Sequence, residues 1–277
     1  MNSTLEWIGY LNNDLSSQTH HHWGYAAFCS ALVGLSGLVP ILILPNFQHQ
    51  QQNVNNNQEQ KNSNLANLSY LRWMLSFAVG GLLGDVFFHL LPEALTNVKN
   101  HEDSTIIGLC IIFGLVTFTI IEKTLENSGL NQASGYLNLF ANCMDNFNHG
   151  LAVGGAFLVS NKVGFVTTAC ILVHEIPHEV GDFAILMNSG FSRGQAAKAQ
   201  FSTAFVGIIG AAVALALDSI GWMMSLFIIP FTCGGFLHIA LVSILPDLLE
   251  SQDTKDCIKV LSGIIFGIIM MMGTTIL

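Results

Sequence analysis

The chain is poor in charged residues, and especially in basic ones. Asp, Glu, Lys and Arg make up 10% of its 277 residues, whereas about a quarter of a soluble domain is charged. Nine basic residues stand against 18 acidic ones, and the net charge is −9. This balance excludes nucleic acid as a partner. Because 51% of the residues are apolar, we predict an all-α protein that spans the lipid bilayer many times.

Closely spaced cysteine pairs are also absent. The six cysteines stand singly, five of them inside apolar segments, so the sequence offers no thiolate metal cluster and no sign of a disulfide framework. We interpret them as small buried residues. They are Cys29, Cys110, Cys143, Cys170, Cys233 and Cys257.

The apolar residues gather in eight segments, each near the length that crosses about 30 Å of hydrocarbon. We therefore expect eight transmembrane helices. The segments are residues 24–45, 70–92, 105–121, 136–159, 163–186, 197–217, 224–247 and 257–277.

The few basic residues predict the orientation. If the N-terminus is non-cytosolic, seven of the nine lie at cytosolic ends or loops, and only Lys99 and Lys162 lie outside. Both termini are then expected outside the cytosol, with residues 1–23 as a non-cytosolic tail. Residues 46–69, which contain runs of Gln and Asn, are expected to form a flexible cytosolic loop.

Two parts of the chain resemble each other. The stretch from Gly80-Gly81 to Leu91-Pro92 matches the stretch from Gly234-Gly235 to Leu245-Pro246 without a gap, at a constant offset of 154 residues. The two stretches would run in opposite directions through the membrane, which is typical of an inverted repeat. We therefore expect residues 24–121 and 197–277 to form two three-helix repeats around a central helix pair, residues 136–186.

The central helix pair carries most of the polar residues that are unexpected inside an apolar segment. Asp145 and His149 are four residues apart, as are His174 and His178, so each pair shares one helix face. A short turn near residues 160–162 would fold the two helices into an antiparallel hairpin and bring the four side chains together. Since such groups are costly in hydrocarbon unless they are neutralised, we predict a metal site, with Pro177 kinking the helix beside it.

The donor types narrow the choice of metal. Imidazole and carboxylate ligands without thiolates suit Zn²⁺, Fe²⁺ or Mn²⁺ better than Cu⁺, Mg²⁺ or Ca²⁺.

Further polar residues fall in or near other apolar segments. Asp85, His89 and Glu93 share one face of the second segment, where they form either an approach path from the outer side or a polar contact between helices. For the remaining residues the alternatives are a place on the metal pathway and a supporting structural role. These residues are Glu179, Asp182 and His238.

The motif HEIPHE at 174–179, paired with DNFNHG at 145–150, resembles the ZIP family of divalent-metal transporters, in particular its intracellular secretory-pathway members. The resemblance implies transport of Zn²⁺ or Fe²⁺ between the lumenal or extracellular side and the cytosol, in the Golgi apparatus or endoplasmic reticulum, as part of metal homeostasis. It also implies a binuclear site near the membrane midplane, with His149 and His178 placed to bridge two ions. The implied ligands are Asp145, Asn146, His149, His174, Glu175 and His178.

The chain departs from the usual family pattern at one motif, and this departure bears on which metal is transported. The usual family pattern at 145–150 is His-Asn-Phe-x-Asp-Gly, and here the His and Asp have changed places. A branch of the family shares this swap, and for that branch Fe²⁺ competes with Zn²⁺ as the substrate. The sixth segment lacks a carboxylate that some relatives supply, so a second ion would be weakly held or absent.

A different class of protein fits part of the pattern. His174-Glu175-x-x-His178 is also the signature of zinc metalloproteases, some of which act inside membranes. Pro177 distorts the helix that such a site needs, and the donors of the neighbouring helix would fill the open position of a catalytic metal. We therefore expect a transporter and not an enzyme, with a binding protein that does not transport as a further alternative. The sequence leaves a homodimer open.

Overall fold

The protein is all-α, as predicted. The computed structural model describes residues 23–43, 58–96, 98–130, 132–217, 223–250 and 253–274, and these contain helices and no strand. Nearly all of the predicted tail and the first part of the predicted loop lie outside the described residues. The remainder of that loop, residues 58–69, is helical and forms the first turns of α3 (Gln58–Asp85). The prediction of a flexible loop is wrong there, because Gln, Glu, Lys, Leu and Ala favour helix.

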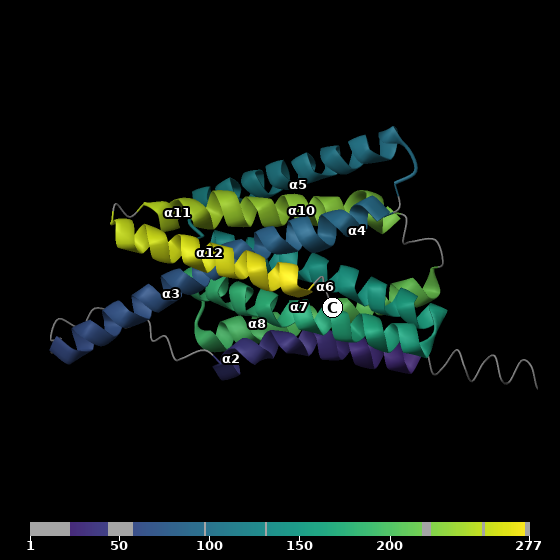
Figure 1. Cartoon of the computed structure of the whole chain (residues 1–277), viewed down its shortest axis with the longest axis horizontal. Helices are drawn as coiled ribbons and strands as arrows, with labels where there is room; N and C mark the ends of the chain where they lie inside the picture. The colour runs from purple at the N-terminus through teal and green to yellow at the C-terminus, as the bar shows by residue number, and fades with distance from the viewer. Residues whose placement is uncertain are drawn as a thin grey trace, which may run out of the picture.

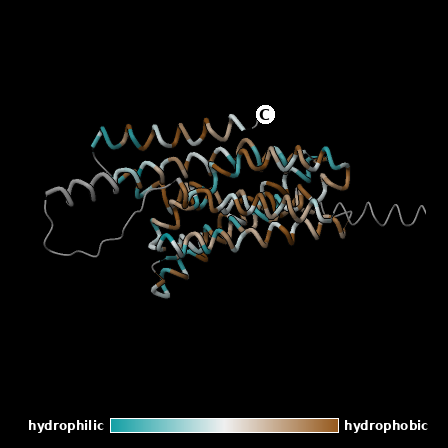
Figure 2. The backbone as a smooth tube through the Cα atoms, turned by 90° about the horizontal axis from the view of Figure 1, so that it is seen from below, coloured by the Kyte–Doolittle hydropathy of each residue, from teal (hydrophilic) through white to brown (hydrophobic). Residues whose placement is uncertain are grey.

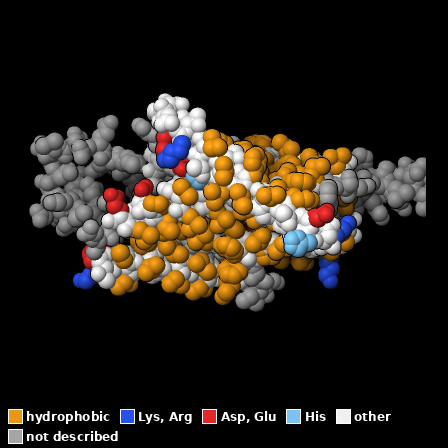
Figure 3. Space-filling model, turned by 90° about the horizontal axis from the view of Figure 1, so that it is seen from above, with side chains coloured by type: hydrophobic (Ala, Val, Ile, Leu, Met, Phe, Trp, Pro, Cys, Tyr) orange, Lys and Arg blue, Asp and Glu red, His pale blue; other side chains and the backbone are white. Residues whose placement is uncertain are grey.

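Among the described residues, six helices are long and apolar enough to cross a membrane. Two more long helices, α6 and α7, carry the polar residues of the predicted site. Apolar residues recur along each helix (Figure 2), and apolar side chains cover the visible face between charged residues at its two ends (Figure 3). The first span is Trp23–Leu42, which includes η1 (Ser36–Leu38) and ends within α2 (Val39–Ile43). The second joins α3 to η2 (Val86–Leu90) and α4 (Leu91–Thr96). The others are α5 (His101–Asn127), α6 (Ala133–Val159), α7 (Asn161–Asn188), α8 (Arg193–Ala216), the run η3 (Met224–Ile228), α10 (Ile229–His238), η4 (Ile239–Ile244) and α11 (Leu245–Leu249), and α12 (Thr254–Thr274).

The helices pack as two groups (Figure 1). In one group α6 packs against α7 and α8, and η1 of the first span contacts α7 and α8. In the other, α3 packs along α12 and α5 along α10. The groups meet chiefly where α7 lies on α3. The two predicted three-helix repeats are therefore intertwined, since each contributes helices to both groups.

Close glycine contacts hold the second group together. A Cβ added to Gly267 of α12 would collide with the backbone oxygen of Phe77 in α3, and a Cβ on Gly114 of α5 would collide with that of Phe231 in α10. Small residues of this kind let membrane helices approach closely. Phe77 and Phe231 are 154 residues apart and lie three residues before the two matching stretches, so positions related by the same offset make the same kind of contact.

Both matching stretches also widen into a π-helix before a Leu-Pro pair. The π-helix η2 precedes Leu91-Pro92, and η4 precedes Leu245-Pro246. A proline inside a helix removes a donor and its ring crowds the preceding turn, and a π-turn relieves this crowding. In the second span the π-turn follows Asp85 and contains His89.

Two arginines bind the carboxyl ends of neighbouring helices. Arg72 of α3 donates to the backbone oxygen of Leu248 in α11 at 3.0 Å, and Arg193 at the start of α8 donates to that of Ile41 in α2. A cation at a helix C-terminus is favourable, because the last carbonyls lack backbone donors.

A substitution in α5 tests the glycine contacts. Gly114→Ala is expected to lower the melting temperature of the detergent-purified protein, because the added methyl must push α5 away from α10 at a cost of roughly 1–3 kcal/mol. Gly108→Ala, in the same helix where a Cβ meets no atom within 4 Å, is the control and is expected to melt no lower than the unaltered chain. Equal melting temperatures for the two variants would contradict the close contact.

Candidate metal site

The hairpin of α6 and α7 positions the predicted donors. Ser160 alone separates the two helices, and its side chain accepts a hydrogen bond from the backbone N–H of Val163 at 3.2 Å, which caps α7. The turn is thus tighter than predicted. α7 is one continuous helix through Pro177, so Pro177 does not break it.

The ring nitrogen Nε2 of His149 lies at the centre of one donor group. It is 3.0 Å from Glu175 Oε2, 3.3 Å from Asp145 Oδ2 and 3.4 Å from His174 Nε2. One ring nitrogen carries at most one proton, so it cannot satisfy two carboxylates and a second imidazole. Ligand atoms of a tetrahedral Zn²⁺ with bonds of about 2.1 Å are about 3.4 Å apart. The spacing around His149 is close to that of ligands around a shared cation.

A second donor group contains Asp85, Asp145 and His178. Their ligand atoms lie within 4.8 Å of one another, and none of the three residues is more than 3% exposed. Asp145 belongs to both groups. Asp85 Oδ2, Asp145 Oδ1 and both ring nitrogens of His178 are buried without a hydrogen-bond partner. Such atoms are costly to bury unless something binds them, and a cation would bind the two carboxylate oxygens and one of the two ring nitrogens of His178.

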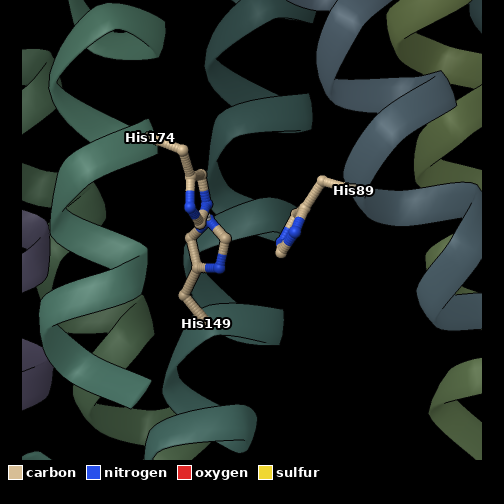
Figure 4. Close-up of side chains that lie close together, drawn as sticks. All are labelled: His89, His149 and His174. Atoms are coloured by element: carbon tan, nitrogen blue, oxygen red, sulfur yellow. Dashed lines mark hydrogen bonds between the residues drawn. The ribbon is translucent and has the colours of Figure 1, made fainter. Parts of the chain in front are cut away.

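His89 extends the first group toward the edge of the bundle. It approaches His149 and His174, and the three rings gather between the helices (Figure 4). The ring centroids of His89 and His174 are 4.3 Å apart. The side chain of His89 is 30% exposed, and Glu93 lies beyond it with its Oε2 3.9 Å from His89 Nε2. These two residues therefore connect the buried groups to the exterior, and Asp85 belongs to the buried groups themselves.

The side chain of Asn146 contacts Asn142, one turn earlier in α6. Its amide nitrogen donates to Asn142 Oδ1 at 2.6 Å and to the backbone oxygen of Asn142 at 3.2 Å. This fixes the orientation of the amide and leaves Asn146 Oδ1 buried without a partner. The free oxygen is the atom that a metal ion would use.

Glu179 and Asp182 follow His178 within about one turn of α7. They belong to a hydrogen-bond network that the sequence did not predict. Asn142 donates to both carboxylates, at 3.4 Å to Glu179 Oε2 and closely to Asp182 Oδ2. Gln200 of α8 also donates to Glu179 Oε2, at 2.6 Å. Asn142 comes four residues before Asn146, and this spacing could have predicted that the two share a helix face. No pattern in the sequence near Gln200 indicated its role.

His238 lies apart from the metal-capable groups of the described residues. Its Nε2 is 2.8 Å from Glu122 Oε2, and its Nδ1 is 3.0 Å from Thr119 Oγ1. Ser243 donates to the same Glu122 oxygen at 2.9 Å. Because both ring nitrogens are paired, this placement favours the structural alternative, a polar connection between α5 and the α10–η4 helix.

Comparison with known proteins gives one family. The sequence profile described as ZIP Zinc transporter matches residues 20–131 and 127–275. A protein named zinc transporter ZIP13 from Pongo abelii is 44% identical over 93% of this chain and 80% of its own length. The Drosophila melanogaster protein named zinc transporter ZIP13 homolog is 38% identical over 97% and 93%. The human zinc transporter ZIP13 is 38% identical over 93% and 82%.

The shared position of Asp145 predicts unequal effects of two substitutions on metal binding. Asp145→Ala removes a ligand from both donor groups and is expected to lower bound zinc per purified chain, measured by mass spectrometry of metals, more than His174→Ala does. His174 belongs to one metal-capable group, with His89 and His149, and its loss leaves Asp85, Asp145 and His178 in place. A larger loss of zinc in His174→Ala would show that the two groups do not share Asp145.

Proposed function

Because this chain belongs to the ZIP family and is a divalent-metal transporter, we propose that the ion crosses the membrane through the α6–α7 hairpin with the help of α3. The family assignment makes the chain a transporter and not an enzyme, so the metalloprotease alternative is set aside. Its relatives are named zinc transporters, which supports Zn²⁺ as the transported substrate.

The observation that carries the proposal is a surplus of buried acidic groups. Five carboxylates on α3 and α7 and in the middle of α6 are at most 1% exposed, and the buried residues of the described chain include no Lys or Arg. Buried carboxylates normally require a paired cation. Here that cation is the substrate itself. The five residues are Asp85, Asp145, Glu175, Glu179 and Asp182.

We further propose that two ions occupy the site together. One lies among Asp145, His149 and Glu175, with His174 and His89 close by; the other lies among Asp85, Asp145 and His178. The grouping favours Asp145 as the bridging ligand, rather than His149 and His178 as the family resemblance implies. The approach path leads from Glu93 and His89 to the first ion.

The packing supports a specific movement. The first span, α6, α7 and α8 form one group, and α3, α5, α10 and α12 form the other. We propose that access alternates when the first group moves against the second, and not when one sequence repeat moves against the other. Since Asp85 and His89 come from the second group, such a movement separates ligands and releases the ion.

Membrane, orientation and assembly remain proposals. Non-cytosolic termini are proposed from the distribution of the nine basic residues. A Golgi or endoplasmic reticulum membrane is proposed from the family resemblance. A homodimer is also proposed, and cross-linking in intact membranes tests it.

Loss of one ligand tests the site. His178→Ala is expected to lower zinc uptake into proteoliposomes at least roughly tenfold, because the group with Asp85 and Asp145 loses its imidazole. The control is His101→Ala, at the exposed start of α5, which is expected to transport normally. Full uptake by a folded His178→Ala protein would rule out this site.

Exchange of two ligands tests the choice of metal. We propose that the swapped positions of Asp145 and His149 allow Fe²⁺ as well as Zn²⁺. The double variant Asp145→His with His149→Asp is expected to shift the ratio of Zn²⁺ to Fe²⁺ uptake toward Zn²⁺, measured by competition in sealed vesicles of known orientation. An unchanged ratio would assign selectivity to other residues.

A further inference from the structure

Glu179 and Asp182 lie outside the donor groups proposed for the two ions, yet they are equally buried. Glu179 is 0% and Asp182 1% exposed, and both touch the same nitrogen, Asn142 Nδ2. Two ions among Asp85, Asp145 and Glu175 would leave Glu179 without a cation, and Asp182 would face only the ring of His178, at 3.8 Å. The buried residues of the described chain again include no Lys or Arg for them.

Each of these carboxylates has one oxygen held and one oxygen free. Glu179 Oε2 accepts from Gln200 and Asn142, and Asp182 Oδ2 accepts from Asn142. Glu179 Oε1 and Asp182 Oδ1 are buried without a hydrogen-bond partner. Carboxylates that bind metals are commonly oriented in this way, by a donor on the oxygen that does not face the ion.

Neighbouring side chains complete a set of donors. Asn138, which is 1% exposed, lies against Asp182, and its Oδ1 has no hydrogen-bond partner. His178 Nδ1 is 3.8 Å from Asp182 Oδ2. On the other side, Glu179 Oε1 faces Gly37 of the first span, at 3.2 Å from the position of an added Cβ. Glycine therefore leaves space beside the free oxygen of Glu179.

The position of these residues indicates the direction in which an ion would leave the two donor groups. Along α7 they follow His178 by one to four residues, which is about one turn of helix, toward the end where α7 stops and α6 begins. Beyond them Ser134 and Ser189 approach each other at 3.4 Å, and the amide of the half-buried Gln132 donates to the backbone oxygen of Gly190. Polar side chains thus continue from the donor groups to this end of the hairpin, opposite to the side of Ser160.

We propose that Glu179, Asp182 and Asn138 form an additional, oxygen-rich cation site that receives the divalent ion from His178 on its way to the end of the hairpin where α6 begins. The proposal rests on the proposed function and adds one more binding site to the proposed ion pathway. Oxygen donors suit harder ions such as Mn²⁺ and Fe²⁺ and hold Zn²⁺ less tightly than the imidazole groups do. An ion in transit must be held weakly enough to leave, which these ligands provide.

The test uses the full chain in lipid nanodiscs and does not depend on transport. The imidazole-containing groups are first filled with Zn²⁺, and Mn²⁺ is then titrated while bound Mn²⁺ is counted by electron paramagnetic resonance. The unaltered chain is expected to bind one Mn²⁺ more than the double variant Glu179→Gln with Asp182→Asn. Both new amides keep a carbonyl oxygen for Asn142 and Gln200, so the network and the fold are preserved.

A matched control removes the same number of buried carboxylates elsewhere. Asp103→Asn with Glu122→Gln changes one residue at the start of α5 and one in the contact with His238, and it is expected to bind as many Mn²⁺ ions as the unaltered chain. In proteoliposomes the Glu179/Asp182 variant is expected to transport zinc roughly tenfold more slowly while its zinc affinity stays within about twofold.

Equal Mn²⁺ binding by the variant and the unaltered chain would overturn the proposal, whether or not transport falls, because the two carboxylates would then have a role other than holding an ion. Failure of the proposed function is recognised separately: His178→Ala would keep full zinc uptake.

Discussion

The structure depends on carboxylates and imidazoles that are buried without a Lys or Arg in contact with them. Moving an ion of this size out of water costs several kcal/mol even after relaxation, and a Lys or Arg beside it would remove most of that cost. It would also occupy the place of the substrate. The chain instead leaves one oxygen each of Asp85 and Asp145, both oxygens of Glu175 and both ring nitrogens of His178 without hydrogen-bond partners. The bundle must therefore be held together by other contacts, which are the glycine crossings and the connection between His238 and Glu122.

What the sequence could predict is what depends on local spacing. Residues four apart on a helix share a face, and one short turn sets two helices antiparallel, so the meeting of Asp145 and His149 with His174 and His178 followed from the chain alone. The contribution of α3 followed only in part. The spacing of Asp85 and His89 indicated one face, but only the fold shows that Asp85 reaches the buried group with His178 and that His89 lies over His174.

Where prediction was wrong or incomplete, long-range packing decided the outcome. Gln200 is a buried polar residue in the interior of α8, a helix of mostly small and apolar residues, and its partner Glu179 comes from another helix. The ring of His238 could have faced the metal, and its pairing with Glu122 depends on how α5 lies on α10. None of these contacts leaves a periodic signal in the sequence.

The correspondence at an offset of 154 residues explains why a symmetrical frame can hold an asymmetrical site. Phe77 and Phe231 occupy matching places at the two glycine crossings, and η2 and η4 both widen before Leu-Pro. The side chains on these π-helices differ. Asp85 and His89 face the metal-capable groups, whereas the residues 154 positions later are Ile239, which is buried, and Ser243, which bonds to Glu122. One copy of the π-helix thus supplies ligands to the hairpin, and the other stabilises the frame. The candidate ligands come from both helix groups, so in the proposed mechanism a relative shift of the groups changes the coordination of the ion directly.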